Sequence, residues 1–288
     1  MSNMEGKICL ITGSNSGIGK ATAIGLAKMG ATIVMACRSK KKGEDALQEI
    51  KTKSGNNKID LMIVDLSSQK SIHNFVKNFK KHYNKLHVLI NNAGVHCFKR
   101  EETIDGFEMN FAVNYLAPFL LTNLLLDVIK ASAPARIINI SSRYHRYATL
   151  EFEDLQSKKS YKFSYKTGAI AYCKSKLALT IFTYELARKL EGTGVTVNCL
   201  CPGVVRTNLI KERIPLPIKI LSHLMVHQKT PEEGAETPIY LASSPDVEGI
   251  TGKFFVDKKI MPEYQSCYNR RTAQRLWEIS EKLTGFEG

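Results

Sequence analysis

No two of the seven cysteines in this chain stand in the CxxC spacing that zinc sites and redox motifs use. Several of them lie inside apolar runs, where a thiol packs like a small hydrophobic side chain. Cys199 and Cys201 are the closest pair, but no histidine or second cysteine pair accompanies them, so we predict core packing there and no metal site. Such cysteine usage is typical of an intracellular protein without structural disulfides.

The sequence also lacks long uninterrupted apolar runs. The N-terminal residues contain no apolar core of a signal peptide. The most apolar long stretch, 117–131, is shorter than a bilayer-spanning helix and contains Asn123 and Asp127. We therefore expect no transmembrane anchor, and a location that is either cytoplasmic or peripherally membrane-associated.

Acidic side chains are scarce relative to basic ones: 27 Asp and Glu stand against 41 Lys and Arg, for a formal charge of +14. This balance favours anionic partners such as phosphates or acidic lipid surfaces. The chain has no zinc-finger spacing and no aromatic RNA-binding motif, so we expect no nucleic-acid partner.

Short apolar runs alternate along the chain with longer segments of helical periodicity. The predicted strands cover residues 7–12, 32–37, 59–66, 87–94, 135–142, 194–203 and 252–257. The predicted helices cover residues 17–30, 43–54, 71–83, 107–130, 170–190, 230–244 and 271–283. Near-continuous Val, Ile and Leu strands between amphipathic helices predict an α/β fold. We expect a Rossmann-like, doubly wound parallel sheet of about seven strands with helices on both faces.

No internal repeat or linker interrupts this order, so we expect residues 1–288 to form a single domain. Within it we expect a substrate loop at about 204–229 and a C-terminal extension at about 258–288. The last predicted helix places Trp277 in an apolar stripe that is typical of packing. The helix before it begins with a capping box, Thr230 and Glu233.

The first predicted strand ends in the glycine-rich turn TGSNSGIG, residues 12–19. Gly13 permits a tight turn, Gly17 lets the backbone approach a ligand, and Gly19 allows the helix to pack closely on the strand. The unpaired N–H groups of the helix start then suit a diphosphate. Methyltransferases also use glycine-rich first turns, so this motif by itself leaves that class open.

The end of the second predicted strand carries Cys37 and Arg38, followed by Ser39 and Lys40, with no acidic residue. An acidic side chain there would bind the ribose 2′-hydroxyl of NAD, whereas an arginine suits the 2′-phosphate of NADP. The sequence therefore predicts NADP(H) as the cofactor.

Further motifs follow in order: NNAG at 91–94, VNYLAPF at 113–119, NISS at 139–142 and CPGVVRT at 201–207. Tyr172 and Lys176 form the one YxxxK pair in the chain. With the glycine turn, this set resembles the short-chain dehydrogenase/reductase family. The stretches ACRS, AYCKSKLAL, PGVVRTNL and YLASSPDVEG are similar to its retinol dehydrogenase branch.

The resemblance implies a role for each catalytic residue. Tyr172 acts as acid in reduction and base in oxidation, and the charge of Lys176 lowers the pKa of Tyr172. Ser142 binds the substrate oxygen, and Asn114 supports a proton-relay water. The cofactor contacts that the resemblance implies are Gly13, Ser14, Asn15, Ser16, Gly17, Ile18, Gly19, Arg38, Asp65, Leu66, Asn92, Ala93, Gly94, Tyr172, Lys176, Pro202, Gly203, Val205 and Thr207.

The predicted function is therefore NADP(H)-dependent interconversion of an alcohol and an aldehyde or ketone, acting on a lipophilic or retinal-like small molecule. The alternative is an NADP(H)-binding scaffold or sensor with little catalysis. We expect Ser141 to have a packing or supporting role, and His145 to be a solvated loop residue. The long loop between Ser142 and Tyr172 resembles an insertion of the retinol dehydrogenase branch, and we expect it to border the substrate entrance.

Residues 214–226 are apolar but contain Lys219, Ser222 and His223. Three interpretations stay open for this segment: a lid over an apolar pocket, a peripheral membrane contact, or docking against a neighbouring subunit of a homo-oligomer. Members of the retinol dehydrogenase branch usually carry a hydrophobic N-terminal anchor, and the residues before the first predicted strand do not have that character.

Overall fold

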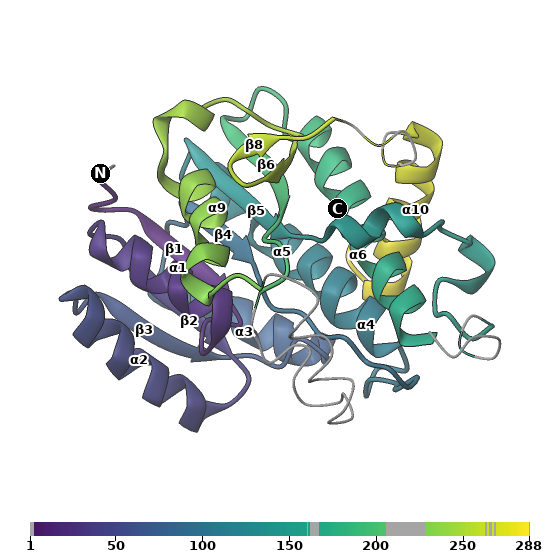
Figure 1. Cartoon of the computed structure of the whole chain (residues 1–288), viewed down its shortest axis with the longest axis horizontal. Helices are drawn as coiled ribbons and strands as arrows, with labels where there is room; N and C mark the ends of the chain where they lie inside the picture. The colour runs from purple at the N-terminus through teal and green to yellow at the C-terminus, as the bar shows by residue number, and fades with distance from the viewer. Residues whose placement is uncertain are drawn as a thin grey trace.

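The computed structural model describes residues 3–159, 161, 167–205, 228–262, 264, 267 and 269–287. Its centre is a sheet with the strand order β3-β2-β1-β4-β5-β6-β7-β8 (Figure 1). The strands are β1 (Ile8–Thr12), β2 (Thr32–Cys37), β3 (Ile59–Ile63), β4 (Val88–Asn91), β5 (Ala135–Ile140), β6 (Val195–Cys201), β7 (Phe254–Val256) and β8 (Lys259–Ile260). The strand order turns back at β1, which pairs with β2 on one side and β4 on the other. The carboxyl edge between β1 and β4 is therefore the ligand-binding position of a doubly wound sheet.

The sheet has eight strands, one more than the seven predicted. All pairs from β3 to β7 are parallel, as predicted, and β8 runs antiparallel to β7. Asp257 and Lys258 make the hairpin turn between them, both with positive φ. The eighth strand escaped prediction because it has two residues, both exposed, and carries no apolar run.

Helices cover both faces of the sheet, as the sequence predicted (Figure 1). The helices are α1 (Gly17–Lys28), α2 (Lys40–Ser54), α3 (Gln69–His82), α4 (Met109–Phe111), α5 (Ala117–Lys130), α6 (Thr167–Lys189), α9 (Pro231–Ser243) and α10 (Arg270–Thr284). Short 3-10 helices cover Arg143–Tyr147, Phe152–Asp154 and Pro245–Val247. Helices α1, α2 and α9 lie over one apolar core, and α3, α5, α6 and α10 lie over a second.

Helices α4 and α5 are joined by a π-helical turn, Ala112–Leu116, into one continuous helix, Met109–Lys130. This helix has 22 residues and is apolar enough to cross a membrane by length and composition, whereas its apolar stretch 117–131 alone was predicted to be too short. Burial explains its composition, since 83% of its most apolar window is buried inside the protein.

Helix α10 closes the outer side of α5 and α6. The Trp277 ring lies 5.0 Å from the ring of Phe119 and 5.8 Å from that of Phe182, centre to centre. The hydroxyl oxygens of Tyr115 and Ser280 are 2.5 Å apart in the same buried contact. The predicted packing stripe of this helix is therefore part of the core.

The ends of the elements differ from prediction mainly at the carboxyl edge. The predicted strands 59–66, 87–94 and 135–142 end in the structure at Ile63, Asn91 and Ile140, so the motif residues beyond them lie in loops. The predicted capping box is confirmed at the start of α9, where Thr230 and Glu233 cap each other's backbone. Thr207 and the segment 214–226 lie outside the described residues.

Candidate active site

The glycine-rich turn joins β1 to α1 and packs directly on the end of β4. Gly13 and Gly17 have positive φ, a region that side-chain-bearing residues rarely adopt. A side chain at Gly19 would collide with Asn92 and with the Gly13 carbonyl. Ser16 caps α1 without a side-chain hydrogen bond, and the first turn of α1 has no acidic residue. The helix start is therefore electrostatically suited to a phosphate group.

Thr12 ties the glycine turn to the NNAG motif. Its Oγ1 accepts hydrogen bonds from the backbone N–H groups of Asn92, at 2.9 Å, and Ala93, at 3.0 Å. In return, Asn92 Nδ2 donates to the Thr12 carbonyl oxygen at 2.8 Å. These bonds hold the two loops on either side of the strand-order reversal in one fixed arrangement.

Arg38 follows β2 and has an exposed side chain. Among the described residues no ion pair involves it, so no carboxylate of that part of the chain neutralises its guanidinium. Cys37 is buried before it, with its Sγ 3.6 Å from the Ser14 hydroxyl oxygen. Ser39 caps α2 by accepting a hydrogen bond from the Lys42 backbone N–H. Arg38 is thus beside the glycine turn, at the edge of the same site.

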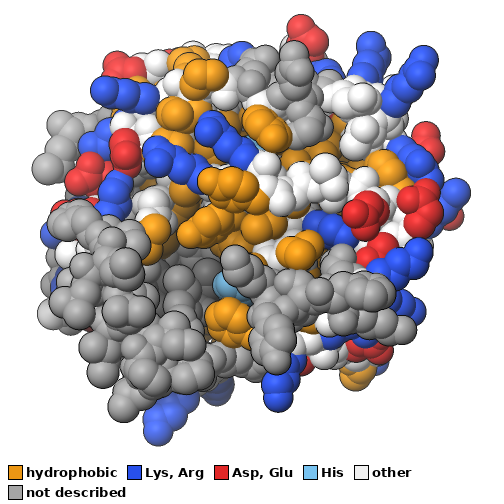
Figure 2. Space-filling view, turned by 45° about the vertical axis from the view of Figure 1, so that its right-hand side comes forward, with side chains coloured by type: hydrophobic (Ala, Val, Ile, Leu, Met, Phe, Trp, Pro, Cys, Tyr) orange, Lys and Arg blue, Asp and Glu red, His pale blue; other side chains and the backbone are white. Residues whose placement is uncertain are grey.

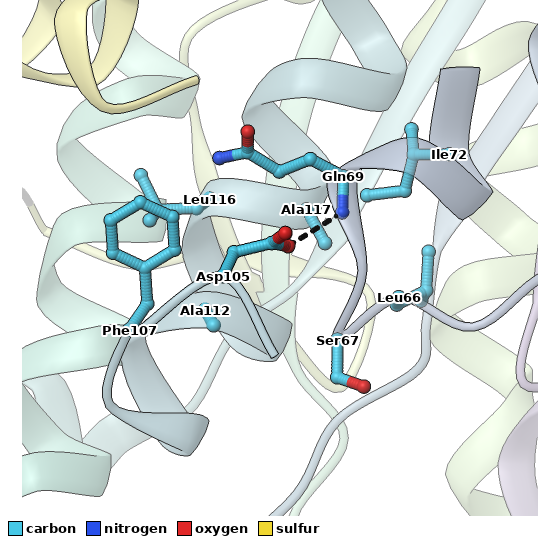
Figure 3. Close-up of a pocket in the computed structure, with 9 residues that line it drawn as sticks. All are labelled: Leu66, Ser67, Gln69, Ile72, Asp105, Phe107, Ala112, Leu116 and Ala117. Atoms are coloured by element: carbon cyan, nitrogen blue, oxygen red, sulfur yellow. Dashed lines mark hydrogen bonds between the residues drawn. The ribbon is translucent and has the colours of Figure 1, made fainter. Parts of the chain in front are cut away.

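Asp65 and Leu66 follow β3 on the far side of Arg38. Asp65 Oδ1 accepts hydrogen bonds from the Ser67 backbone at 3.0 Å and from the Ser67 hydroxyl at 2.7 Å. Leu66 lines a small pocket that Figure 3 draws. The other residues lining this pocket are Ser67, Gln69, Ile72, Asp105, Phe107, Ala112, Leu116 and Ala117. None of the four predicted catalytic residues lines it, so this pocket is separate from the chemistry.

Three predicted catalytic side chains meet where β5 and α6 approach each other. Ser142 lies two residues beyond β5 and caps the 3-10 helix that follows, and Tyr172 and Lys176 lie on α6. Lys176 Nζ donates a hydrogen bond to the Ile140 carbonyl oxygen at 2.8 Å and lies 5.8 Å from the centre of the Tyr172 ring. All three side chains are buried.

Burial is the main cause of the pKa shifts of Tyr172 and Lys176. It raises the pKa of Tyr172, and the hydrogen bond from the Ser142 hydroxyl opposes that shift only in part. Burial also lowers the pKa of Lys176 to about 8, and the neighbouring Cys201 thiol opposes that shift only in part. The net direction for Tyr172 is upward, because loss of water outweighs the hydrogen bond from Ser142. The lowering by the Lys176 charge that the resemblance implies stays a prediction.

Asn114 lies in the π-helical turn and is fully buried. Its Oδ1 accepts from the Val95 backbone N–H at 2.8 Å, and its Nδ2 donates to the Val95 carbonyl oxygen at 2.9 Å. The same Nδ2 lies 3.0 Å from Ser175 Oγ on α6. The Asn114 side chain is thus a tie between α6 and the loop after NNAG, and π-helical turns often mark functional positions.

The residues after β6 approach the glycine turn from the other side. Gly203 has positive φ, and Val205 packs on Gly234 of α9, next to Ile18. Val205 and Lys229 form an isolated parallel bridge, and the Lys229 backbone N–H donates to the Val204 carbonyl oxygen at 2.8 Å. The backbone shortly after β6 and the backbone shortly before α9 therefore lie side by side.

Two neighbours of Ser142 differ in their surroundings. Ser141 Oγ donates to the Lys176 carbonyl oxygen at 3.2 Å and lies 2.8 Å from Thr180 Oγ1. Its hydroxyl therefore links the end of β5 to α6. His145 was expected in solvent, but it is buried, with Nδ1 2.6 Å from the Ser142 carbonyl oxygen. The 3-10 turn folds this histidine back under Ser142, which the sequence pattern did not reveal.

Two residues near Tyr172 were not predicted as part of the site. The Cys201 thiol at the end of β6 is close enough to influence the titration of both Tyr172 and Lys176. The His96 ring is stacked on the Tyr172 ring with 4.7 Å between centres. A signal for His96 existed in the sequence: it is a histidine two residues beyond a strand-end motif, on the edge where ligands bind.

Comparison with known proteins shows which family the chain belongs to. The model of the family described as short chain dehydrogenase matches residues 7–153 and 158–215. Retinol dehydrogenase 14 from Homo sapiens is 44% identical over 98% of this chain and 87% of that protein. Retinol dehydrogenase 12 from Homo sapiens is 43% identical, also over 98% of this chain and 87% of that protein.

Solved structures share the fold along most of the chain. A crystal structure of an uncharacterized protein from Mycobacterium paratuberculosis is similar with a TM-score of 0.79 and 28% identity, over 100% of this chain and 96% of that chain. The RhlG/NADP active-site complex from Pseudomonas aeruginosa has a TM-score of 0.71 and 27% identity, over 88% of this chain and 95% of that chain. The strand-end motifs, the sheet and these likenesses agree: the chain is an oxidoreductase of the short-chain dehydrogenase family, in its retinol dehydrogenase-like branch.

Proposed function

We propose that this protein is an NADP(H)-dependent reductase that converts a lipophilic aldehyde or ketone to its alcohol. The observation that carries the proposal is the meeting of Ser142, Tyr172 and Lys176 at the carboxyl edge of the sheet, beside the glycine-rich turn. A binding scaffold would have no need for a buried phenol with both a hydroxyl donor and an ammonium group beside it.

In the reduction, Ser142 and Tyr172 act on the carbonyl oxygen of the substrate. Ser142 donates a hydrogen bond to that oxygen, and Tyr172 transfers its phenolic proton to it as the alcohol forms. When bound, the nicotinamide supplies the hydride. Lys176, with a pKa lowered to about 8, is mostly protonated at pH 7 and places its charge near the Tyr172 ring as the phenolate develops.

The protonation state of Tyr172 suits the role of proton donor in the reduction. Burial raises the pKa of Tyr172, so the phenol in the free protein is fully protonated at neutral pH and ready to act as an acid. Oxidation of an alcohol would need the phenolate form, which the same burial disfavours. An enzyme accelerates both directions of the reaction alike, so the proposed direction, from carbonyl to alcohol, rests on a cellular NADPH pool that is kept reduced.

Arg38 supports the choice of NADP(H) over NAD(H). It is an exposed, permanently charged group beside the glycine turn, where the 2′-phosphate of a bound dinucleotide would lie. Lys40 and Lys42 add basic charge next to it. A structural neighbour bound to NADP is in keeping with this assignment.

The surroundings of Ser142 support a lipophilic substrate. Tyr144 and Tyr147 follow it with exposed rings, and Phe98 and Val204 are also exposed hydrophobic side chains on loops that follow strands. One face of the molecule gathers hydrophobic side chains across its middle, with charged groups around them (Figure 2). Relatives named retinol dehydrogenases make retinal a natural first substrate to test.

The proposal covers the whole chain as a single NADP(H)-binding domain, with a substrate loop at 204–229 and a C-terminal extension at 258–288. In the part that the structure describes, α10 belongs to the core of the sheet rather than to a separate unit. This arrangement gives the extension a structural role in the same domain.

The decisive experiment follows NADPH absorbance with a panel of short aldehydes, long-chain aldehydes, ketones and retinal, with NADH in parallel. We expect turnover with NADPH and apolar aldehydes, and much slower turnover with NADH. Tight NADPH binding without turnover on any member of the panel would favour the scaffold or sensor alternative instead. Thermal protection by S-adenosylmethionine but not by NADPH would show that the cofactor assignment is wrong.

A further inference from the structure

We propose that His96 is a positioning residue for Tyr172: its imidazole lies against the phenol ring and holds the hydroxyl in line with Ser142. This inference rests on the proposed catalytic role of Tyr172 and adds a residue that the strand-end motifs do not contain. Three features of the structure carry it: the ring contact, the way the His96 backbone is held, and the burial of the imidazole.

The ring contact is direct. The His96 and Tyr172 ring centres are 4.7 Å apart with an angle of 26° between the planes, so the two rings are stacked. On the same loop, Phe98 stacks on His96, also at 4.7 Å with an angle of 29°. Aromatic pairs at this separation attract each other beyond simple burial. Tyr172 is thus confined between the imidazole on its ring face and the hydroxyl of Ser142 at its oxygen.

The loop that carries His96 is held on both sides by asparagine side chains. Asn114 accepts from the Val95 N–H at 2.8 Å and donates to the Val95 carbonyl oxygen at 2.9 Å. Asn110 accepts from the Cys97 N–H at 2.9 Å and donates to the Cys97 carbonyl oxygen at 3.4 Å. Both asparagines are fully buried. The residues before and after His96 are therefore fixed, which leaves its ring little freedom to move away from Tyr172.

Helix α6 presses on the same loop from the Tyr172 side. Gly168 lies one turn before Tyr172, and a side chain there would collide with the backbone of Cys97 and Phe98. The absence of a side chain lets the start of α6 approach the loop closely enough for the two rings to touch. The contact is thus built into the packing of the helix and does not depend on side-chain rotamers alone.

The His96 ring stays neutral in this position. Burial lowers the pKa of His96, and the Gly168 backbone opposes that shift only in part. Its Nε2 is buried and has no hydrogen-bond partner among the described residues. A neutral ring adds no second positive charge beside Lys176, whose own protonation burial already weakens. Because Nε2 is not used, the planar ring rather than the nitrogen accounts for the contact.

The test compares three substitutions of His96 in the full-length protein, measured as kcat, KM and the Kd for NADPH. In His96→Ala the Tyr172 ring loses the aromatic ring that is stacked on it. We therefore expect kcat to fall roughly 10- to 100-fold, the scale of a misplaced catalytic group. KM and the NADPH Kd should stay within about twofold, because the substitution leaves the binding surfaces intact. His96→Phe keeps a stacked ring and should restore kcat to within about threefold of wild type. His96→Leu fills the space without a planar ring, so its kcat should lie between those of His96→Ala and His96→Phe.

Gly168→Ala is an independent test of the same contact that keeps the histidine at position 96. The added methyl group pushes the loop away from α6, so we expect a kcat loss similar to that of His96→Ala. The two substitutions together should cost little more than either one, because both break the same contact. An unchanged kcat in His96→Ala, or a His96→Phe enzyme as slow as His96→Ala, would overturn the proposal; the second result would assign the role to the nitrogen.

A readout that does not need turnover separates this inference from the proposed function. With 3-fluorotyrosine at position 172, the fluorine resonance reports the two orientations of the ring. We expect one dominant resonance in wild type and in His96→Phe, and an averaged or doubled signal in His96→Ala. A restrained ring in a wild-type protein that turns over no carbonyl would contradict the proposed function and leave the His96 contact standing. Identical spectra in all variants would contradict the contact itself.

Discussion

The ammonium group of Lys176 donates a hydrogen bond to the backbone carbonyl oxygen of Ile140, with 2.8 Å between Nζ and oxygen. This bond joins the middle of α6 to the last residue of β5. Since Ser142 follows β5 and Tyr172 lies one turn before Lys176, the same bond fixes the distance between the two hydroxyl groups of the site. Lys176 is therefore both a charge beside the phenol and a structural tie.

Tyr172→Phe tests the proton transfer. The ring keeps its contacts with His96 and Lys176, so folding and NADPH binding should be preserved. Loss of the hydroxyl should lower kcat by about 10²- to 10⁴-fold, the usual range for a general acid. The comparison is between stopped-flow NADPH oxidation and fluorescence titration of NADPH on the same preparation. Full activity in this variant would refute the mechanism.

Lys176→Met tests the effect of burying an ammonium group. The folded-state pKa of about 8 is below the unfolded value, so the unfolded chain binds more protons between pH 8 and about 10. Stability from this group therefore rises with pH across that window. Relative to Lys176→Met, the wild-type free energy of unfolding should increase by about 2 kcal/mol between pH 7 and pH 9.5. Denaturant unfolding of both proteins at each pH measures this difference, and a constant difference would show that Lys176 is not desolvated.

Arg38→Leu tests the selection of NADP(H). Removal of a charge-assisted contact to the 2′-phosphate should raise the Kd for NADPH roughly 10- to 100-fold and leave the Kd for NADH nearly unchanged. Adding Cys37→Asp should then favour NADH, although Cys37 is buried against Ser14 and the second substitution should cost stability. Lys28→Leu, at the other end of α1, is the charge-matched control. An unaltered preference for NADPH in the Arg38 variant would rule out the assignment.

Trp277→Ala tests whether the C-terminal extension belongs to the core. The ring packs on Phe119 and Phe182, so its removal should lower the free energy of unfolding by about 3–5 kcal/mol. Arg275→Ala changes an exposed residue of the same helix that pairs with Glu153, and should cost about 1 kcal/mol or less. Similar melting temperatures for the two variants would mean that α10 contributes little to stability.

The order of strands and helices was predictable because each buried strand is a continuous apolar run. Leu10 in β1, Val34 in β2 and Ile137 in β5 are fully buried, and all three strands run parallel in the same sheet. Strand ends were harder to place. Polar Asn139 still pairs with β6, and the paired residues of β5 end at Ile140 although the sequence pattern shows no break there. Periodicity alone does not reveal where the hydrogen-bonded ladder stops.

Of the candidate site, the sequence predicted the residues that belong to recognisable motifs. Ser142, Tyr172 and Lys176 come together in space, but the raised pKa of Tyr172 depends on burial by residues distant in sequence. The burial of His145 depends on how its loop folds back, which no local pattern encodes. For His96, the place after a strand-end motif was a signal, but it did not reveal the ring contact with Tyr172. Such contacts arise from the packing of loops on α6, and the side chains that make them are visible only once the fold is assembled.

The bridge between Val205 and Lys229 has a consequence for the evolution and engineering of specificity. Because the backbones of Val205 and Lys229 pair, the chain segment between them begins and ends at one place, between β6 and α9. Insertions within a segment closed in this way change the entropy of loop closure only slowly with length. We therefore predict that exchanges between positions 206 and 228 alter substrate preference while Tyr172 on α6 keeps its place.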